Sequence, residues 1–130
     1  MVTFMTNTNT RQDYSPQKSF RDVTSTAKLF HFKLPVYVTD SVWKDCIDIQ
    51  NYRDKQIDDL AVLHRLRHVL FMAASTLHGR TEIREHNLRV YRIPNADPGQ
   101  QRRPEAVDLN LSIHKDEDEN SIVTIKFPDE

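Results

Sequence analysis

The chain has 130 residues, of which 19 are acidic, 18 are basic and 38% are hydrophobic, so it can build one modest core but not two domains. The single cysteine, Cys46, excludes an internal disulfide and a metal cluster built on cysteine, and the two glycines exclude the glycine-rich loops that cradle nucleotide phosphates. The apolar stretches are short and the first residues are polar, which predicts a cytoplasmic protein without a membrane-spanning helix or a secretory signal.

Charge is unevenly distributed along the chain. Residues 1–63 carry eight basic and eight acidic side chains, residues 64–103 carry eight arginines and three acids, and residues 104–130 carry two lysines and eight acids. The middle segment is therefore +5 and the last segment −6. These segments either neutralise each other within the fold, which the usual adjacency of consecutive strands favours, or form two separate fields that steer a partner.

The N-terminal third contains a polar leader and the first two elements. Residues 1–20 show no hydrophobic period, which predicts a disordered leader or an arm that orders on assembly, followed by one domain over residues 21–130. Asp22 is placed to cap a short helix over residues 23–30. The β-branched and aromatic run Pro35–Val38 predicts a strand that begins at a proline.

A second short helix is predicted over residues 41–48, capped by Thr39 or Asp40. Its apolar stripe comprises Val42, Trp43, Cys46, Ile47 and Ile49. We expect the tryptophan to anchor the core, because apolar neighbours surround it in the sequence. Asp45 and Asp48 are expected to face away from this stripe.

Residues 57–78 give the strongest helical pattern in the chain. Apolar residues, mostly leucines, recur at steps of three or four from Leu60 to Leu77, and Gly79 follows just past the end. The run Phe71–Ala74 widens the apolar face, so we expect the C-terminal half of this helix to be the more buried.

The remaining chain alternates between apolar and polar residues and predicts three strands, Leu88–Ile93, Ala106–His114 and Ser121–Phe127. The charged segment 115–120 is typical of a hairpin loop. Together these elements predict an α+β fold, with an antiparallel sheet of about four strands covered on one face by two or three helices.

Metal and nucleophile motifs are weak. His64 and His68 are four residues apart on one helix, but no third ligand is evident, and Arg65 occupies the place of a glutamate base, so a solvated helix face is the favoured interpretation. Cys46 lies on an apolar stripe, which favours a small buried hydrophobe over a nucleophile. We therefore expect no metal, no cofactor and no enzymatic activity.

The polar face of the predicted sheet is the more informative surface. Alternation places Arg89 and Tyr91 on one face, alongside the polar positions of the next two strands, and such a face can stack a base or hold a polar ligand. Arginines in the following loop have the geometry to neutralise phosphates. An ordinary solvated sheet or an oligomer contact is the competing interpretation. The predicted binding residues are Arg80, Arg84, Arg89, Tyr91, Arg92, Arg102 and Arg103.

Several short motifs also occur in a familiar order. They are Asp22-Val23-Thr24, Pro35-Val36-Tyr37-Val38-Thr39 with Val42-Trp43 and Asp45-Cys46, Leu70-Phe71-Met72-Ala73, Tyr91-Arg92-Ile93-Pro94, and Val123-Thr124-Ile125 before Pro128. Over about residues 22–130 the chain resembles a small family of bacterial, plasmid and phage proteins catalogued as a domain of unknown function. Members carry a glycine after the first helix, where this chain has His31 or Phe32, and an acid where it has His68. The resemblance implies an accessory protein of a mobile element.

These observations predict a non-enzymatic binding module of a mobile genetic element that engages a host component in a counter-defence or regulatory role and works as a homo-oligomer. The expected partner is a host protein or a small polar ligand, with no membrane involved. The alternative is a nucleic-acid or nucleotide binder that uses the arginine-rich segment 80–103, which would show a steep dependence of affinity on salt.

Overall fold

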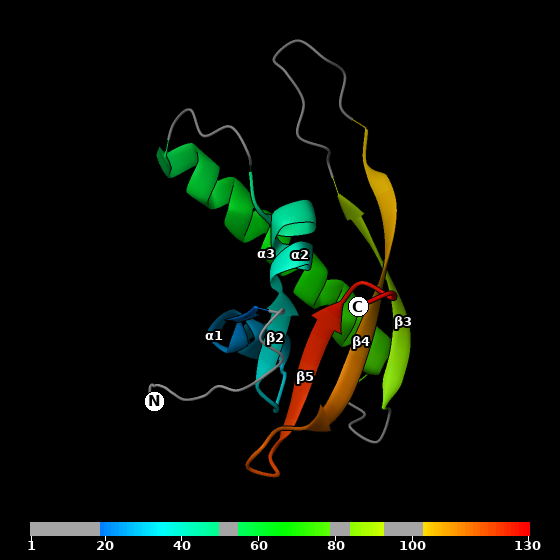
Figure 1. Cartoon of the computed structure of the whole chain (residues 1–130). Coiled ribbons are helices and arrows are strands. Elements are labelled where there is room, and N and C mark those ends of the chain that lie inside the picture. Colours follow the sequence, from blue (N-terminus) through cyan, green and yellow to red (C-terminus); the bar gives the residue numbers. More distant parts are fainter. Residues whose placement is uncertain (1–18, 50–54, 79–83, 93–102) are drawn as a thin grey trace.

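The computed structural model describes residues 19–49, 55–78, 84–92 and 103–130 (Figure 1). Its strands are β1 (Phe20–Asp22), β2 (Val36–Thr39), β3 (Glu85–Arg92), β4 (Glu105–Lys115) and β5 (Ser121–Lys126). Its helical segments are α1 (Thr24–Ala27), the 3-10 turn η2 (Lys28–Phe30), α2 (Asp40–Val42), the π turn η3 (Trp43–Ile47) and α3 (Lys55–Leu77). The predicted α+β class is confirmed. The leader prediction concerns residues 1–20, of which 1–18 lie outside the described ranges.

The predicted antiparallel sheet of about four strands is refined to a mixed sheet of five strands, in which one pairing is parallel. Its five strands have the order β1-β2-β5-β4-β3, and β2 runs parallel to β5, with Val36 opposite Val123. No local turn connects these two strands, because the chain passes through α2, η3, α3, β3 and β4 between them. β1 is only three residues long and shows no alternation that would reveal it in the sequence.

The core lies between one face of the sheet and α3, which crosses behind β4 and β3 in Figure 1. Along β4 the residues Leu109, Leu111 and Ile113 are buried, and along β3 Leu88 and Val90 are buried. The buried residues of α3 are Leu66, Val69, Leu70, Ala73 and Leu77. Leu60, in the N-terminal half of α3, is 65% exposed, which confirms that the C-terminal half is the more buried.

Short polar contacts fix the first helical turn against the sheet. Asp22 Oδ1 accepts a hydrogen bond from the Thr24 amide at 2.9 Å, but the N-cap position of α1 is Val23, so the prediction that Asp22 caps this helix needs correction. Thr24 Oγ1 in turn accepts from the Val36 amide at 3.0 Å, so α1 is tied to the start of β2. The turn ends at His31, whose φ of 68° lies in the left-handed region that favours glycine.

The end of α3 also has a left-handed residue. His78 has a φ of 50°, and its amide donates to the Ala74 carbonyl at 3.0 Å. This residue therefore adopts the conformation that commonly ends a helix. The predicted terminator, Gly79, lies outside the described residues.

The segment after β2 forms a helical turn that widens into a π turn. Thr39 Oγ1 accepts from the Val42 amide at 3.3 Å, which confirms Thr39 as the cap. Trp43 is only partly buried at the rim of the core, where the guanidinium carbon of Arg21 lies 4.8 Å from its ring centroid. The expectation that Trp43 lies inside the core therefore needs correction, because its ring is covered by an arginine of β1 on one side. The core positions of this turn are filled by Val42, Cys46 and Ile47.

Candidate binding surface

The sheet has a polar face turned away from α3. We call it the open face and define it as the side chains at odd positions 85–91 of β3 and even positions 106–114 of β4, together with Thr124 and Lys126 of β5. The register places these residues opposite one another across the three strands. In Figure 1 this face is turned toward the viewer, with α3 behind it. The prediction that Arg89 and Tyr91 share this face is confirmed.

An exposed ion pair lies at the centre of the β3 part of the open face. Arg89 Nε lies 2.9 Å from Asp108 Oδ1, and Arg89 Nη2 lies 3.5 Å from Asp108 Oδ2. The hydrogen bonds to Arg89 lower the pKa of Asp108, and the same bonds raise the pKa of Arg89. The pair joins an arginine of the basic middle segment to an acid of the last segment, as expected if these segments neutralise each other within the fold.

The β4–β5 part of the open face carries neutral polar groups together with Lys126. His114 Nε2 and Thr124 Oγ1 lie 2.9 Å apart, and Thr124 is 4% exposed. Asn110 lies opposite Lys126, and its Oδ1 atom is buried without a hydrogen-bond partner within the described part of the chain. On β5 this face includes the buried residues Ile122 and Thr124, so the exposed part of the open face lies mainly on β3 and β4.

Tyr91 is the aromatic residue of the open face. The residue is 51% exposed, and its backbone amide donates a hydrogen bond to His68 Nε2 at 3.0 Å. The Tyr91 and His68 ring centroids lie 6.4 Å apart. Burial lowers the pKa of His68, so the neutral imidazole that accepts this bond is favoured. Helix α3 thus positions Tyr91 through a contact that the sequence does not reveal.

The same contact bears on the proposed histidine pair. The Nε2 lone pair of His68 accepts the Tyr91 amide, whereas His64 is exposed on the same helix. Across the ranges that the structure describes, no three His, Cys, Asp or Glu side chains are grouped to hold a metal ion.

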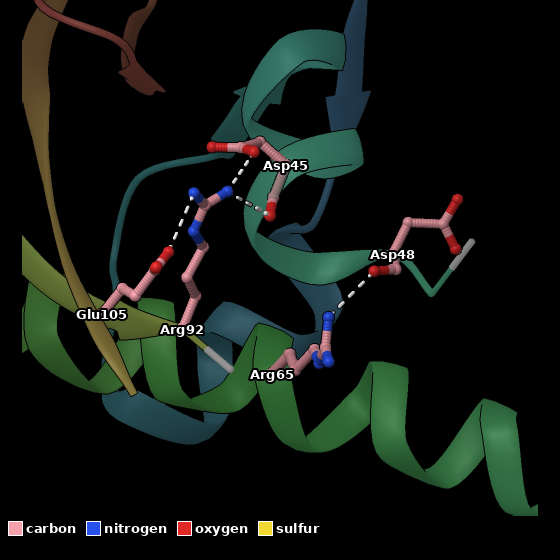
Figure 2. Close-up of polar contacts among 5 residues, drawn as sticks. All are labelled: Asp45, Asp48, Arg65, Arg92 and Glu105. Carbon is pink, nitrogen blue, oxygen red and sulfur yellow. Dashed lines mark hydrogen bonds and ion pairs between the residues drawn. The ribbon is translucent and has the colours of Figure 1, made fainter. Parts of the chain in front are cut away.

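Arg92 belongs to the other face of the sheet (Figure 2). Its Nη1 atom contacts the carboxylate of Asp45 and lies 3.2 Å from the Asp45 carbonyl, and its Nη2 atom lies 3.3 Å from Glu105 Oε1. Burial lowers the pKa of Arg92, but Asp45, together with Cys46 and Glu105, raises it by more, so the pKa lies above its ordinary value. Arg92 therefore ties η3 to β3 and β4, and it lies on the opposite face of the sheet from Tyr91.

Asp45 lies outside the buried positions of η3, and its carboxylate binds Arg92. A neighbouring contact attaches the end of this segment to α3, because Arg65 Nη1 donates to the Asp48 carbonyl at 3.0 Å (Figure 2). Together the two contacts join this segment to β3 and to α3.

Cys46 is buried beneath this cluster, at 2% exposure. Burial, with the nearby Asp45 carboxylate, raises the pKa of the thiol to about 11. The thiolate is the nucleophilic form of cysteine, and it is scarce near neutral pH under these conditions. The prediction that Cys46 is a small buried hydrophobe is confirmed.

The other predicted site residues are arginines near the strand starts. Arg84 and Arg103 are exposed and precede β3 and β4, and neither has an ion-pair partner among the residues described. Arg80 and Arg102 lie outside the described ranges. Reasoning from the sequence missed Glu85 and Asn87, which precede the predicted start of the strand although they continue its alternation on the open face.

No family model, curated protein or solved structure matches the chain. The resemblance to a phage and plasmid family therefore stays a prediction. Within the described ranges, no helix has the length and apolar character needed to cross a membrane.

Proposed function

We propose that the protein is a non-enzymatic binding module that engages a host protein through its open face, in a counter-defence or regulatory role for a mobile genetic element. The observation that supports this most directly is the half-exposed ring of Tyr91 beside the Arg89–Asp108 pair, on a sheet surface that α3 does not cover. Tyrosine and arginine are enriched among the residues that dominate protein–protein binding energy.

The balance of charge favours a protein over a nucleic acid as the partner. The open face carries Glu85 and Asp108 against Arg89 and Lys126, so its formal charges cancel. Nucleic-acid binding depends on cations that are free to neutralise phosphates. Arg89 is already paired with a carboxylate, and Arg92 lies on the opposite face of the sheet.

The role in a mobile element rests on the sequence resemblance, because the geometry alone names no partner. A flat polar surface with one aromatic residue fits a folded protein better than a small molecule, which usually binds in a concave pocket. Burial of the thiol of Cys46 adds support, since it withdraws that group from covalent chemistry at neutral pH.

Affinity capture from a bacterial host extract tests the proposal with two matched variants. Tyr91→Ala removes the aromatic ring of the open face, and Phe71→Ala removes a ring that is 55% exposed on α3. We expect the wild type and Phe71→Ala to retain one stoichiometric protein that Tyr91→Ala loses, with and without nuclease treatment. A partner that both variants retain equally, or one that nuclease releases, would contradict the proposal; release by nuclease would support the nucleic-acid alternative.

A further inference from the structure

β3 is an edge strand, and one side of it has no strand partner among the described residues (Figure 1). Two hydrogen bonds fix the direction of its peptide groups. The Arg84 carbonyl accepts from the Ile113 amide of β4 at 2.8 Å, so it points toward β4. The Tyr91 amide donates to His68 of α3, so it points away from β4. These two bonds set the alternation along the whole strand.

The alternation directs three further residues outward. Glu85, Asn87 and Arg89 have the same parity as Tyr91, so their amides and carbonyls also point away from β4. All three residues are exposed. At Tyr91 this edge is already closed by His68, so the stretch without a strand partner among the described residues runs from Glu85 to Arg89.

The side chains of this stretch are self-complementary. Glu85 and Arg89 lie two residues on either side of Asn87 and share the open face. In an antiparallel pair of two such strands centred on Asn87, Glu85 of each copy lies directly opposite Arg89 of the other. Opposite charges at directly facing positions stabilise strand pairing, and like charges destabilise it.

We propose that the protein forms a twofold dimer in which β3 of one copy pairs with β3 of a second copy, from Glu85 to Arg89, centred on Asn87. This interface does not rest on the proposed function. The outward amides and carbonyls of Glu85, Asn87 and Arg89 form the new ladder, and each Glu85 pairs with Arg89 of the other copy. The hydrogen bonds from Arg89 to Asp108 use Nε and Nη2, and a guanidinium has donors for a second carboxylate.

The placement of Glu85 and Arg89 about Asn87 favours a second copy of this protein over other chains as the partner of the β3 edge. Charged residues on an edge strand usually prevent pairing with other chains. Here their placement about Asn87 makes the same charges attractive toward an antiparallel copy, and only toward that register. The twofold axis would stand perpendicular to the sheet, so both open faces would lie on the same side of one continuous sheet.

The first test distinguishes the contribution of the Asn87 backbone amide to the interface from that of the Asn87 side chain. Asn87→Pro removes the outward amide without removing a bond to β4, whereas Asn87→Ala keeps that amide. Sedimentation velocity at protein concentrations up to about 1 mM measures this association, because a dimer with a dissociation constant of that size is then about half populated. We expect the wild type and Asn87→Ala to dimerise and Asn87→Pro to stay monomeric. Thermal melting confirms that each variant is folded.

The second test uses charge reversal. Glu85→Arg makes both facing pairs at the interface repulsive. Arg89→Glu combined with Asp108→Lys does the same. The second substitution of that double variant keeps an ion pair between β3 and β4, with the two charges exchanged. We expect each variant alone to dimerise at least about tenfold more weakly than the wild type. Mixed together, they should form a heterodimer, because every facing pair is again attractive.

Hydrogen exchange gives an independent readout. The amides of Asn87 and Arg89 should exchange more slowly as the wild-type concentration rises, and those of Asn87→Pro should show no such change at Arg89. A wild type that stays monomeric at about 1 mM, a dimer that Asn87→Pro leaves intact, or reversed variants that fail to associate on mixing would each overturn the proposed interface.

Discussion

The side chain of His68 accepts a hydrogen bond of 3.0 Å from the backbone amide of Tyr91. This bond joins α3 to the edge strand β3. Its donor, the Tyr91 amide, points away from β4 and makes no hydrogen bond in the β3–β4 ladder. It requires the neutral imidazole with its proton on Nδ1, because a protonated ring has no acceptor. The position of the tyrosine on the open face therefore depends on the charge state of a histidine in α3.

This dependence predicts a loss of stability on acidification. Burial lowers the pKa of His68 from its ordinary value of 6.5, so the unfolded chain binds a proton there at a higher pH than the folded chain does. The contribution of His68 to the free energy of unfolding is present above pH 6.5 and declines as the pH falls below that value toward the lowered pKa. Urea unfolding at several pH values measures it.

The matched variants for this experiment are His68→Gln and His64→Gln. The glutamine carbonyl at position 68 retains an acceptor for the Tyr91 amide and does not titrate, so His68→Gln should show a smaller loss of stability on acidification than the wild type. His64 is exposed on the same helix, and its replacement should leave the wild-type dependence unchanged. Equal pH dependence in the wild type and His68→Gln would refute this role of His68.

Arg92 and Arg89 provide a second prediction, because both lie on β3 and both pair with a carboxylate of β4. Arg92 has 25% of its side chain exposed and also binds Asp45, whereas the side chain of Arg89 is 61% exposed. Arg92→Met should lower the free energy of unfolding by about 1–2 kcal/mol, since it leaves two carboxylates without their shared donor. Arg89→Met should have little measurable effect, because exposed pairs contribute little.

The substitution Arg92→Lys refines this comparison. A lysine carries the charge but cannot bind two carboxylates with a planar fork, so its stability should lie between that of the wild type and Arg92→Met. Urea unfolding of the three proteins at neutral pH gives the order. The interpretation fails if Arg89→Met is as destabilising as Arg92→Met.

Much of the fold follows from local patterns in the sequence. The leucine spacing predicts α3 within two residues at its start and one at its end, and alternation predicts β4 and β5 within one residue at either end. The hairpin between them is also local: Asp116 Oδ1 accepts from the amides of Asp118 and Asn120 at 2.9 Å. These elements need no information from distant parts of the chain.

The features that the sequence did not predict depend on contacts between distant residues. The parallel pairing of β2 with β5 joins residues more than 80 positions apart, and the Asp45–Arg92 contact joins residues 47 apart. Alternation correctly predicts which side chains share the open face. It does not show that His68 reaches the edge of the sheet or that Asp45 contacts Arg92.

Cys46 offers a third prediction, on reactivity. With 2% exposure and a pKa raised to about 11, the thiol should resist alkylation by iodoacetamide in the folded protein near neutral pH. In denaturing urea it should react at the rate of an ordinary thiol. Mass spectrometry after timed quenching measures both rates. Rapid and complete modification of the folded protein would show that this turn opens readily and that the thiol is available for chemistry.

The last prediction concerns Trp43, which packs at the rim of the core beneath Arg21. Deleting a fully buried large aromatic residue typically costs about 3–5 kcal/mol. Because the Trp43 ring is only partly buried, we expect Trp43→Ala to lower the free energy of unfolding by about 2–3 kcal/mol. Trp43→Phe should cost less, since a smaller ring keeps part of the contact.

The contact between Arg21 and the Trp43 ring can be tested separately from the burial of that ring in the core. The guanidinium carbon lies 4.8 Å from the ring centroid, within the range of a cation–π contact, and Arg21 Nε lies 3.2 Å from Asp40 Oδ1. Arg21→Gln should therefore increase quenching of Trp43 fluorescence by acrylamide, whereas Lys44→Gln, which removes the other cation bound to Asp40, should not. Equal quenching in all three proteins would mean that Arg21 does not shield the ring, and a loss of stability in Trp43→Ala at the upper end of the fully buried range would place the ring inside the core.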